Sequence, residues 1–270
     1  MNASTLEPPI VSRAEWQAVH AAHREREKVV TRMRDELAAA RRTLPWTRVD
    51  EPYVFESPAG PCTLADLFAG RSELIVKHFM FGPGWQEDCV GCSFEVDHIE
   101  ATLVHLNHHD VSVVAVARAP MAEIEPFKQR MGWHLPWVSS SGNRFNYDFH
   151  VSFTPAEMAR GRVYYNYAER EFSCEELSGL SVFRRGTDGA IYHTFSTFGR
   201  GAEELLGSYM LLDLTSRGRN ENGPRHDMTD WVRHHDRYDA PGHVGADGRY
   251  LADTDLADTN DTCCAAMRPT

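Results

Sequence analysis

One segment of this chain constrains its fold more than any other. Residues 73–81, ELIVKHFMF, form an almost continuous apolar run. A strand with one face in water alternates apolar and polar residues, whereas a strand covered on both faces is apolar throughout. The run therefore predicts a strand in the middle of an α/β sheet. Two cysteines at C-x-x-C spacing, Cys89 and Cys92, follow it after a short loop.

The pattern after the cysteines predicts how the rest of the sheet is built. Apolar residues fall at steps of four, three, four and three, which describes one helical face: Cys92, Val96, Ile99, Leu103 and Leu106. Residues 111–119 read as a second buried strand, and two β-rich runs flank a turn at Asp188-Gly189. Strand, cysteine pair, helix, strand, helix and hairpin in this order predict a thioredoxin-like α/β fold with a central mixed sheet flanked by helices.

The two ends of the chain have different compositions. Ser12 and Glu15 have capping-box spacing, so a long helix is expected at about 13–42. From residue 241 onward the chain is rich in Asp, Gly, Ala and Thr, with few large apolar residues. We therefore expect a flexible leader at 1–11, a thioredoxin-like domain at 12–240 that includes the helix, and a disordered tail at 241–270.

Charge and hydropathy narrow the range of partners. The net charge of −11 argues against binding to a nucleic-acid backbone, because an acidic protein releases no counterions there. No segment approaches the roughly 20 consecutive apolar residues of a membrane helix, and the N-terminus lacks the pattern of a secretory signal. We expect a cytoplasmic protein without membrane or nucleic-acid partners.

The cysteine pair suggests redox chemistry. In the cytoplasm structural disulfides are rare, so a C-x-x-C there is more often catalytic or metal-binding. The thiolate is the nucleophile, and a helix N-terminus stabilises it through unpaired backbone N–H groups and the helix dipole. Cys89 lies where the helix should begin, and Cys92 lies one turn later on the apolar face. We expect Cys89 to attack and Cys92 to resolve, with no cofactor beyond this dithiol.

A metal site is the alternative for a C-x-x-C. Zinc normally takes four ligands, often from a second C-x-x-C or a pair of histidines. The remaining cysteines, Cys62, Cys174, Cys263 and Cys264, offer no such second pair, so no metal is predicted. A non-catalytic redox sensor or interaction protein, including a metal-binding one, stays open as a second class of function.

A thiol peroxidase is the alternative within redox chemistry. Peroxidases need a hydroxyl donor and a cation beside the attacking cysteine. Gln86, not Thr or Ser, lies three residues before Cys89, and Arg118 at the end of the next strand could supply the cation. Trp85 could flank a substrate groove. His78, inside the apolar strand, could be a site residue or a core histidine with one hydrogen bond.

Several segments also resemble a known family. They extend from about residue 11 to residue 238 and include LADLFAGRSELIVKHFMFGPGWQEDCVGCSFEVDH, VAVARAPMAEIEPFKQRMGWHLPWVSS, FNYDFHVSF and DWVRHHDRY. These look like the bacterial DUF899 family, a thioredoxin-like group of uncharacterised proteins. The resemblance implies a fold related to the peroxiredoxin and alkyl hydroperoxide reductase branch, and it implies little about the reaction.

The resemblance also places individual residues. The C-x-x-C of the family falls on Cys89 and Cys92, and its Gly-Pro-x-Trp falls on Gly82, Pro83 and Trp85. The thioredoxin motif Trp-Cys-Gly-Pro-Cys is absent. Thioredoxins also carry a cis-proline opposite the cysteines, where this chain has LSGLSVF, so Gly179 would let the backbone approach a substrate. Expected partners are a thiol reductant such as a thioredoxin or glutathione system, a disulfide or peroxide substrate, and a second copy in a homodimer.

Overall fold

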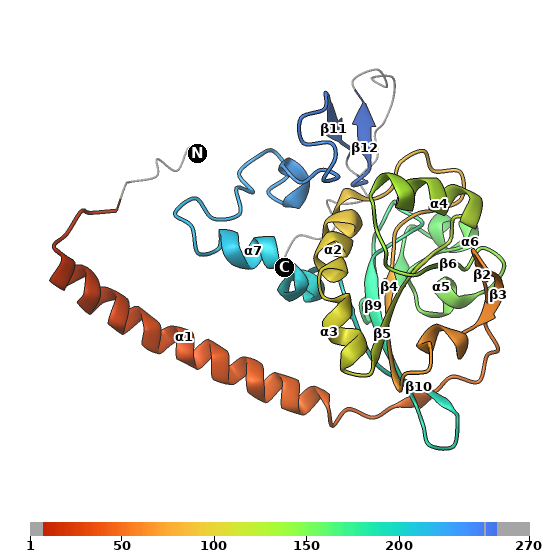
Figure 1. Ribbon diagram of the computed structural model, residues 1–270. Helices are drawn as coiled ribbons and strands as arrows, with labels where there is room; N and C mark the ends of the chain where they lie inside the picture. The colour runs from red at the N-terminus through yellow and green to blue at the C-terminus, as the bar shows by residue number, and fades with distance from the viewer. Residues whose placement is uncertain (1–7, 246, 253–270) are drawn as a thin grey trace. The chain divides into compact units, whose positions relative to one another are not determined.

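The computed structural model describes residues 8–245 and 247–252 (Figure 1). The chain divides into two compact units, residues 1–45 and residues 46–270. The N-terminal helix, which the sequence assigned to the domain at 12–240, lies in the first of these units. Within the described residues, no helix combines the length and apolar content needed to span a bilayer.

The first unit contains α1, Arg13–Arg41, close to the predicted range of 13–42. Its start is set by the predicted capping box. The Ser12 hydroxyl accepts from the backbone N–H of Glu15 at 3.3 Å, and the Glu15 carboxylate accepts from the backbone N–H of Ser12 at 3.0 Å. No residue of α1 is buried. The helix is therefore held by local capping and helix propensity rather than by a core of its own.

The second unit is built on an eight-stranded mixed sheet. Its central strands β4, β5 and β6 are parallel, while β9 runs antiparallel beside β4 and β10 pairs antiparallel with β9. This arrangement of parallel strands, with the cysteine helix crossing between β4 and β5, is the predicted thioredoxin-like fold. The strands are, in spatial order, β1 (Thr47–Arg48), β10 (Ile191–Phe198), β9 (Gly179–Arg185), β4 (Glu73–His78), β5 (Val111–Ala117), β6 (Trp137–Ser139), β2 (Val54–Ser57) and β3 (Gly60–Thr63).

Strand β4 lies between β5 and β9, which explains its apolar sequence. Its side chains alternate between the two faces of the sheet. One face is covered by α2 (Val90–Glu100), α3 (Leu103–His108) and α4 (Met121–Arg130), as Figure 1 shows for α2 and α3. The other face packs against the 3-10 turn η1 (Asp66–Phe68) and α5 (Phe145–Asp148), and Phe55 of the sheet strand β2 belongs to the same core. Each face therefore has its own apolar core.

The segment after the sheet forms a third apolar cluster with α2. Val244 and Tyr250 are buried there with Val90 and Phe94. The segment contains short elements only: η2 (Gly199–Leu205), α7 (Gly207–Leu212), η3 (Met228–Asp230), and the strand pair β11 (Gly242–Val244) and β12 (Tyr250–Ala252). The remaining elements are α6 (Pro155–Ala159) and the hairpin of β7 (Val163–Tyr165) and β8 (Ala168–Arg170).

Two local expectations differ from the structure. The helix predicted across 92–106 is two helices, α2 and α3, which meet at residues 101–102. Residues 242–244 and 250–252 of the predicted disordered tail pair as β11 and β12, because Val244 and Tyr250 supply enough apolar surface to dock on α2. Residues 253–270 lie outside the described part of the chain.

Candidate functional site

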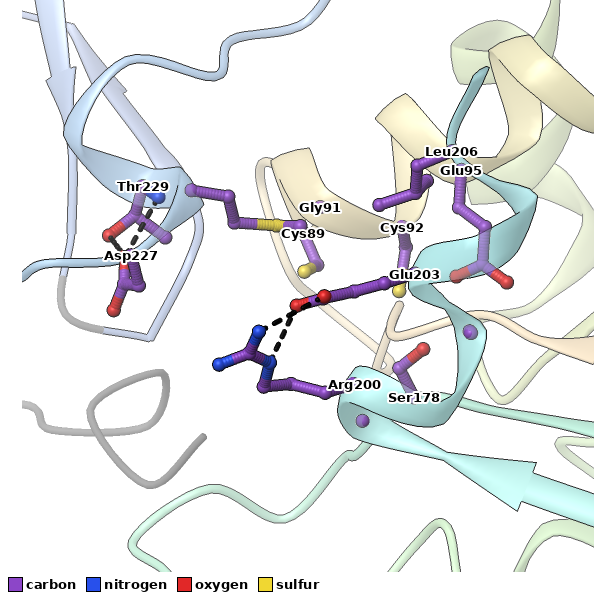
Figure 2. Close-up of a pocket in the computed structure, with 13 residues that line it drawn as sticks. Cys89, Gly91, Cys92, Glu95, Ser178, Arg200, Glu203, Leu206, Asp227 and Thr229 are labelled. Carbon is purple, nitrogen blue, oxygen red and sulfur yellow. Dashed lines mark hydrogen bonds and ion pairs between the residues drawn. The ribbon is translucent and has the colours of Figure 1, made fainter. Parts of the chain in front are cut away.

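The cysteine pair lies at the N-terminus of α2. Cys89 is the N-cap residue in an extended conformation, and its carbonyl accepts from the backbone N–H of Ser93 at 3.0 Å. Cys92 lies one turn further along. The residues are 4% and 1% exposed, and both line a pocket of about 70 Å³. Figure 2 shows them at the start of α2, with Arg200 and Glu203 opposite. A helix N-terminus favours negative charge at Cys89.

Cys92 is held in its protonated form. Burial raises the pKa of the Cys92 thiol well above its usual value, and a hydrogen bond with Cys89 adds to this effect. The ammonium of Lys77 acts in the opposite direction. The two thiols therefore differ in position: Cys89 is the N-cap residue of α2, and Cys92 lies one turn into the helix and hydrogen-bonds to Cys89.

A buried ion pair lies beside the two thiols. Lys77, on β4, is fully buried, and its Nζ lies 2.5 Å from Oε2 of Glu95 on α2 and 2.7 Å from Oγ of Ser178. Burial alone would lower the pKa of Lys77, but its electrostatic interactions with Cys92 and with the Glu95 carboxylate raise it. The Lys77 ammonium thus provides a fixed positive charge under the dithiol.

The C-terminal segment forms one wall of the pocket. The backbone N–H of Val90 donates to the carbonyl of Gly248 at 2.9 Å, and Cys89 forms a β-bridge with Arg249. Met228 lies over the helix start, where a Cβ on Gly91 would come within 2.7 Å of its sulfur. The glycine between the cysteines therefore lets Met228 cover the pair.

A buried carboxylate and a buried histidine connect this segment to the residue before Cys89. Asp88 and His234 are both fully buried, and His234 Nε2 lies 2.5 Å from Asp88 Oδ1. The other Asp88 oxygen accepts from Ser93 Oγ at 2.6 Å. Burial raises the pKa of Asp88, while His234 and Ser93 oppose the rise. The pair joins positions 146 residues apart and fixes the residue before Cys89.

Glu87 adds a third possible metal ligand to Asp88 and His234, within the part of the chain that the structure describes. Its carboxylate, however, is bound by two guanidinium groups, with Arg130 at 3.0 Å and Arg237 at 3.2 Å. Since these cations already balance Glu87 and since Asp88 is hydrogen-bonded to His234, the cluster fits a salt-bridge network better than a cation site.

The opposite wall comes from η2 and the residues before it. Arg200 bonds to Glu203, and Glu203 in turn accepts from Arg219 at 2.9 Å. Figure 2 shows the Arg200–Glu203 pair across from the cysteines. The rest of the lining is mostly apolar, with Ala202, Leu206 and Met228. The dithiol thus lies in a small pocket with an ion pair at one side.

Comparison with known proteins assigns a family. Residues 5–238 match the family described as a bacterial protein of unknown function, DUF899. The chain belongs to the DUF899 family. No curated protein matches this DUF899 chain.

Solved structures similar to this DUF899 protein include peroxiredoxins. Peroxidoxin BcpB from Mycobacterium tuberculosis is 13% identical at a TM-score of 0.42, and the alignment covers 64% of this chain and 99% of that one. A PrxQ mutant from Xylella fastidiosa is 15% identical at a TM-score of 0.40, and the alignment covers 62% of this chain and 94% of that one. The hypothetical protein SMc02350 from Sinorhizobium meliloti 1021 is 14% identical at a TM-score of 0.37, and the alignment covers 56% of this chain and 69% of that one.

Cys89 and Cys92 are brought together as predicted, but the other predicted groove residues of this DUF899 protein lie elsewhere. Trp85 is half-buried, with the Arg249 guanidinium 4.9 Å from its ring centre, and Pro83 is exposed. Neither is among the residues that line the cysteine pocket. A Cβ on Gly179 would come within 2.7 Å of Phe198, so this glycine admits an aromatic ring rather than a substrate.

Arg118 and His78 are also placed away from the cysteine pocket. Arg118 is bound by Glu176 and by the Tyr147 hydroxyl, the latter at 2.7 Å, so it is engaged in its own network. His78 lies on the face of the sheet opposite Lys77, where its Nε2 forms a hydrogen bond of 2.8 Å with Ser181 Oγ. Burial, assisted by the nearby Lys77 charge, lowers the pKa of His78 to about 3.

Sequence reasoning missed the charged residues of the DUF899 site. Lys77 stands in an otherwise apolar strand, and a lysine at such a position must find an anion or lose its charge. That was the available signal for a buried partner. Nothing local marks Glu95 or His234 as partners, since each resembles an ordinary polar residue of its segment. Cys62 and Cys174 lie outside the pocket lining, and Cys263 and Cys264 lie outside the described residues.

Proposed function

We propose that this protein is a thiol–disulfide oxidoreductase of the thioredoxin-like class that acts on small substrates. The Cys89 thiolate attacks one sulfur of a disulfide, forms a mixed disulfide and releases one thiol. The Cys92 thiolate then attacks the Cys89 sulfur, which releases the second thiol and closes a Cys89–Cys92 disulfide. A cellular thiol reductant, such as a thioredoxin or glutathione system, returns the pair to the dithiol.

The hydrogen-bonded thiol pair at the N-terminus of α2 carries this proposal. The helix N-terminus stabilises a thiolate at Cys89, and the Lys77 ammonium stabilises a thiolate at Cys92 when that residue attacks. The proton that leaves Cys92 has an acceptor nearby, because Oε1 of Glu95 has no hydrogen-bond partner among the described residues and Glu95 lines the pocket.

The dimensions of the pocket support a small substrate. Cys89 is 4% exposed, and the space above it is about 70 Å³, bounded by Met228 and Leu206. A water needs about 15 Å³ of such volume, so the pocket holds a few heavy atoms and not a folded protein segment. Glu95 is paired with Lys77, and Glu203 is paired with Arg200 and Arg219. Asp227 is thus the lining carboxylate that no ion pair of the described residues balances, which favours neutral or cationic substrates over anionic ones.

Thiol peroxidase activity is the second candidate, and the same small pocket favours it. The Cys89 thiolate would attack a peroxide oxygen, the O–O bond would break with release of an alcohol, and Cys89 would become a sulfenic acid. Cys92 would then displace water from it and form the same disulfide. Against this candidate, Arg118 is engaged by Glu176, although Arg200 lines the pocket.

One experiment tests both candidates. The reduced protein is mixed with cystamine or with hydrogen peroxide, and disulfides are mapped by mass spectrometry over time. We expect a Cys89–Cys92 disulfide in the wild type, no reaction in Cys89→Ser, and a trapped mixed disulfide in Cys92→Ser with cystamine. Peroxide that outcompetes cystamine, with a sulfenic acid in Cys92→Ser, favours the peroxidase. Oxidation that pairs other cysteines, or no turnover with either oxidant, contradicts both and favours a non-catalytic sensor.

A further inference from the structure

A second pocket, of about 300 Å³, lies on the other face of the sheet from the cysteines. The strand register shows this. Lys77 faces the dithiol, whereas Val76, the position before it, faces the opposite way and belongs to the other core. Val76 is level with Ser181, and Ser181 is level with Ser196, which lines the second pocket. Its volume is at the lower end of the range of small-molecule sites, about 300 to 1,000 Å³.

The backbone around this pocket is unusual. Three non-glycine residues of its lining, His150, Asn166 and Tyr167, have φ of 54°, 50° and 62°. Asn166 and Tyr167 form the two-residue turn between β7 and β8, where glycine is preferred at the second position. A tyrosine there costs roughly 1 kcal/mol or more. The residue is 66% exposed, but its hydroxyl donates to the Ser196 carbonyl at 3.0 Å and its ring meets Phe198 edge-on, so the turn holds the tyrosine against the pocket.

A bulge in β10 presents a histidine to the same pocket. The register of β10 against β9 shifts between His193 and Phe195. His193 Nε2 lies 3.0 Å from the Phe195 carbonyl, so this nitrogen carries the proton and Nδ1 is an acceptor. The same nitrogen contacts Ser196 Oγ at 2.7 Å. β-bulges are common next to functional sites because they redirect a side chain.

The charges and rings of the lining indicate the ligand. Five aromatic side chains line the pocket beside the histidines: Tyr53, Phe149, Tyr164, Tyr167 and Phe198. The lining also carries three carboxylates, Asp50, Glu51 and Asp148, and one guanidinium, Arg48. Asp50 is paired with Arg48, and Asp148 is paired with Arg144 and accepts from Tyr53. The Glu51 carboxylate has no hydrogen-bond or ion-pair partner among the described residues.

Aromatic faces and the unpaired carboxylate of Glu51 together attract a cation. We propose that this pocket binds a small organic ammonium ion, an amine with an apolar body. Its charged nitrogen contacts Glu51 and the tyrosine rings, and its body packs on Phe149 and Phe198. The site is separate from the dithiol and does not depend on the redox chemistry proposed above.

Titration calorimetry with three ligands of one shape tests the proposal. Benzylamine, benzyl alcohol and benzoate differ in charge and share the ring. We expect benzylamine to bind at least tenfold more tightly than benzyl alcohol, and benzoate to bind least. Equal binding of the three, tighter binding of benzoate, or no saturable benzylamine binding up to about 10 mM overturns the proposal.

Two variants locate the site. Tyr167→Gly should weaken benzylamine binding at least tenfold while the unfolding temperature stays level or rises, because glycine relieves the turn. Glu51→Gln, at an exposed position, should weaken binding several-fold without any change in folding. Cys89→Ser should bind as the wild type does. Unchanged binding in both Tyr167→Gly and Glu51→Gln, or lost binding in Cys89→Ser, refutes a site at this pocket.

Discussion

Lys77 and Glu95 form a fully desolvated ion pair between the central strand and the cysteine helix, with Nζ 2.5 Å from Oε2. The pair has two consequences. It fixes α2 against β4, and it places a positive charge beside Cys92. Removal of one partner leaves a buried charge without compensation, whereas removal of both does not.

Glu95→Gln is therefore expected to lower the free energy of unfolding by about 3 kcal/mol. The double variant Lys77→Met/Glu95→Leu should recover most of that loss. In this double variant the closing of the Cys89–Cys92 disulfide should slow on the order of tenfold per unit of pKa that Cys92 gains. Urea unfolding and stopped-flow oxidation measure the two effects. A double variant that closes its disulfide at the wild-type rate would show that the pair is structural only.

Gly91→Ala should uncover the cysteines. Alanine favours the helix by up to about 1 kcal/mol, but its Cβ would lie 2.7 Å from the Met228 sulfur, so Met228 must move. We expect iodoacetamide to label Cys89 several-fold faster, as measured by mass spectrometry. Met228→Ala should have the same effect. Gly142→Ala is the matched control, because a Cβ there meets nothing within 4 Å. Equal labelling in Gly91→Ala and Gly142→Ala would count against Met228 as the cover.

His234→Ala should loosen the C-terminal segment. The substitution leaves the buried Asp88 carboxylate without its partner, which costs about 3 kcal/mol. Hydrogen exchange should rise first in residues 242–245 and 247–252, which pack against α2. His235→Ala is the control, because its contact with Asp97 is partly exposed and its loss costs less than about 1 kcal/mol. Protection that is lost equally in both variants would exclude a specific role for the Asp88–His234 pair.

Stability should fall in mild acid because of His78. Its pKa is about 3 in the folded protein against 6.5 when exposed, so the unfolded chain binds the proton first. The stabilisation is complete above pH 6.5 and is lost as pH falls from 6.5 toward 3. As the pH falls from about 7.5 to about 5, this residue should lower the free energy of unfolding by about 2 kcal/mol.

His78→Gln tests this linkage, since glutamine can keep a hydrogen bond to Ser181 without titrating. Urea unfolding at the two pH values should show a pH dependence about 2 kcal/mol smaller than that of the wild type. His23→Gln, on the exposed helix α1, is the control and should keep the wild-type dependence. The same dependence in His78→Gln and the wild type would mean that His78 does not titrate as proposed.

The sequence by itself determined the elements that depend on local patterns. The apolar run became β4, the capping box began α1 at Arg13, and the Asp188-Gly189 turn joined β9 to β10. It also indicated Cys89 at a helix start, since periodicity and capping are properties of neighbouring residues.

Only the tertiary structure decided which distant residues meet. Asp88 and His234 are 146 residues apart, and Lys77 meets Glu95 because one strand and one helix pack face to face. It also places Arg118, Gly179 and His78 outside the cysteine pocket. The course of the chain decides where a residue lies, and alternation along a strand decides which face of the sheet its side chain is on. Burial and charge compensation act across such contacts, and no local pattern specifies them.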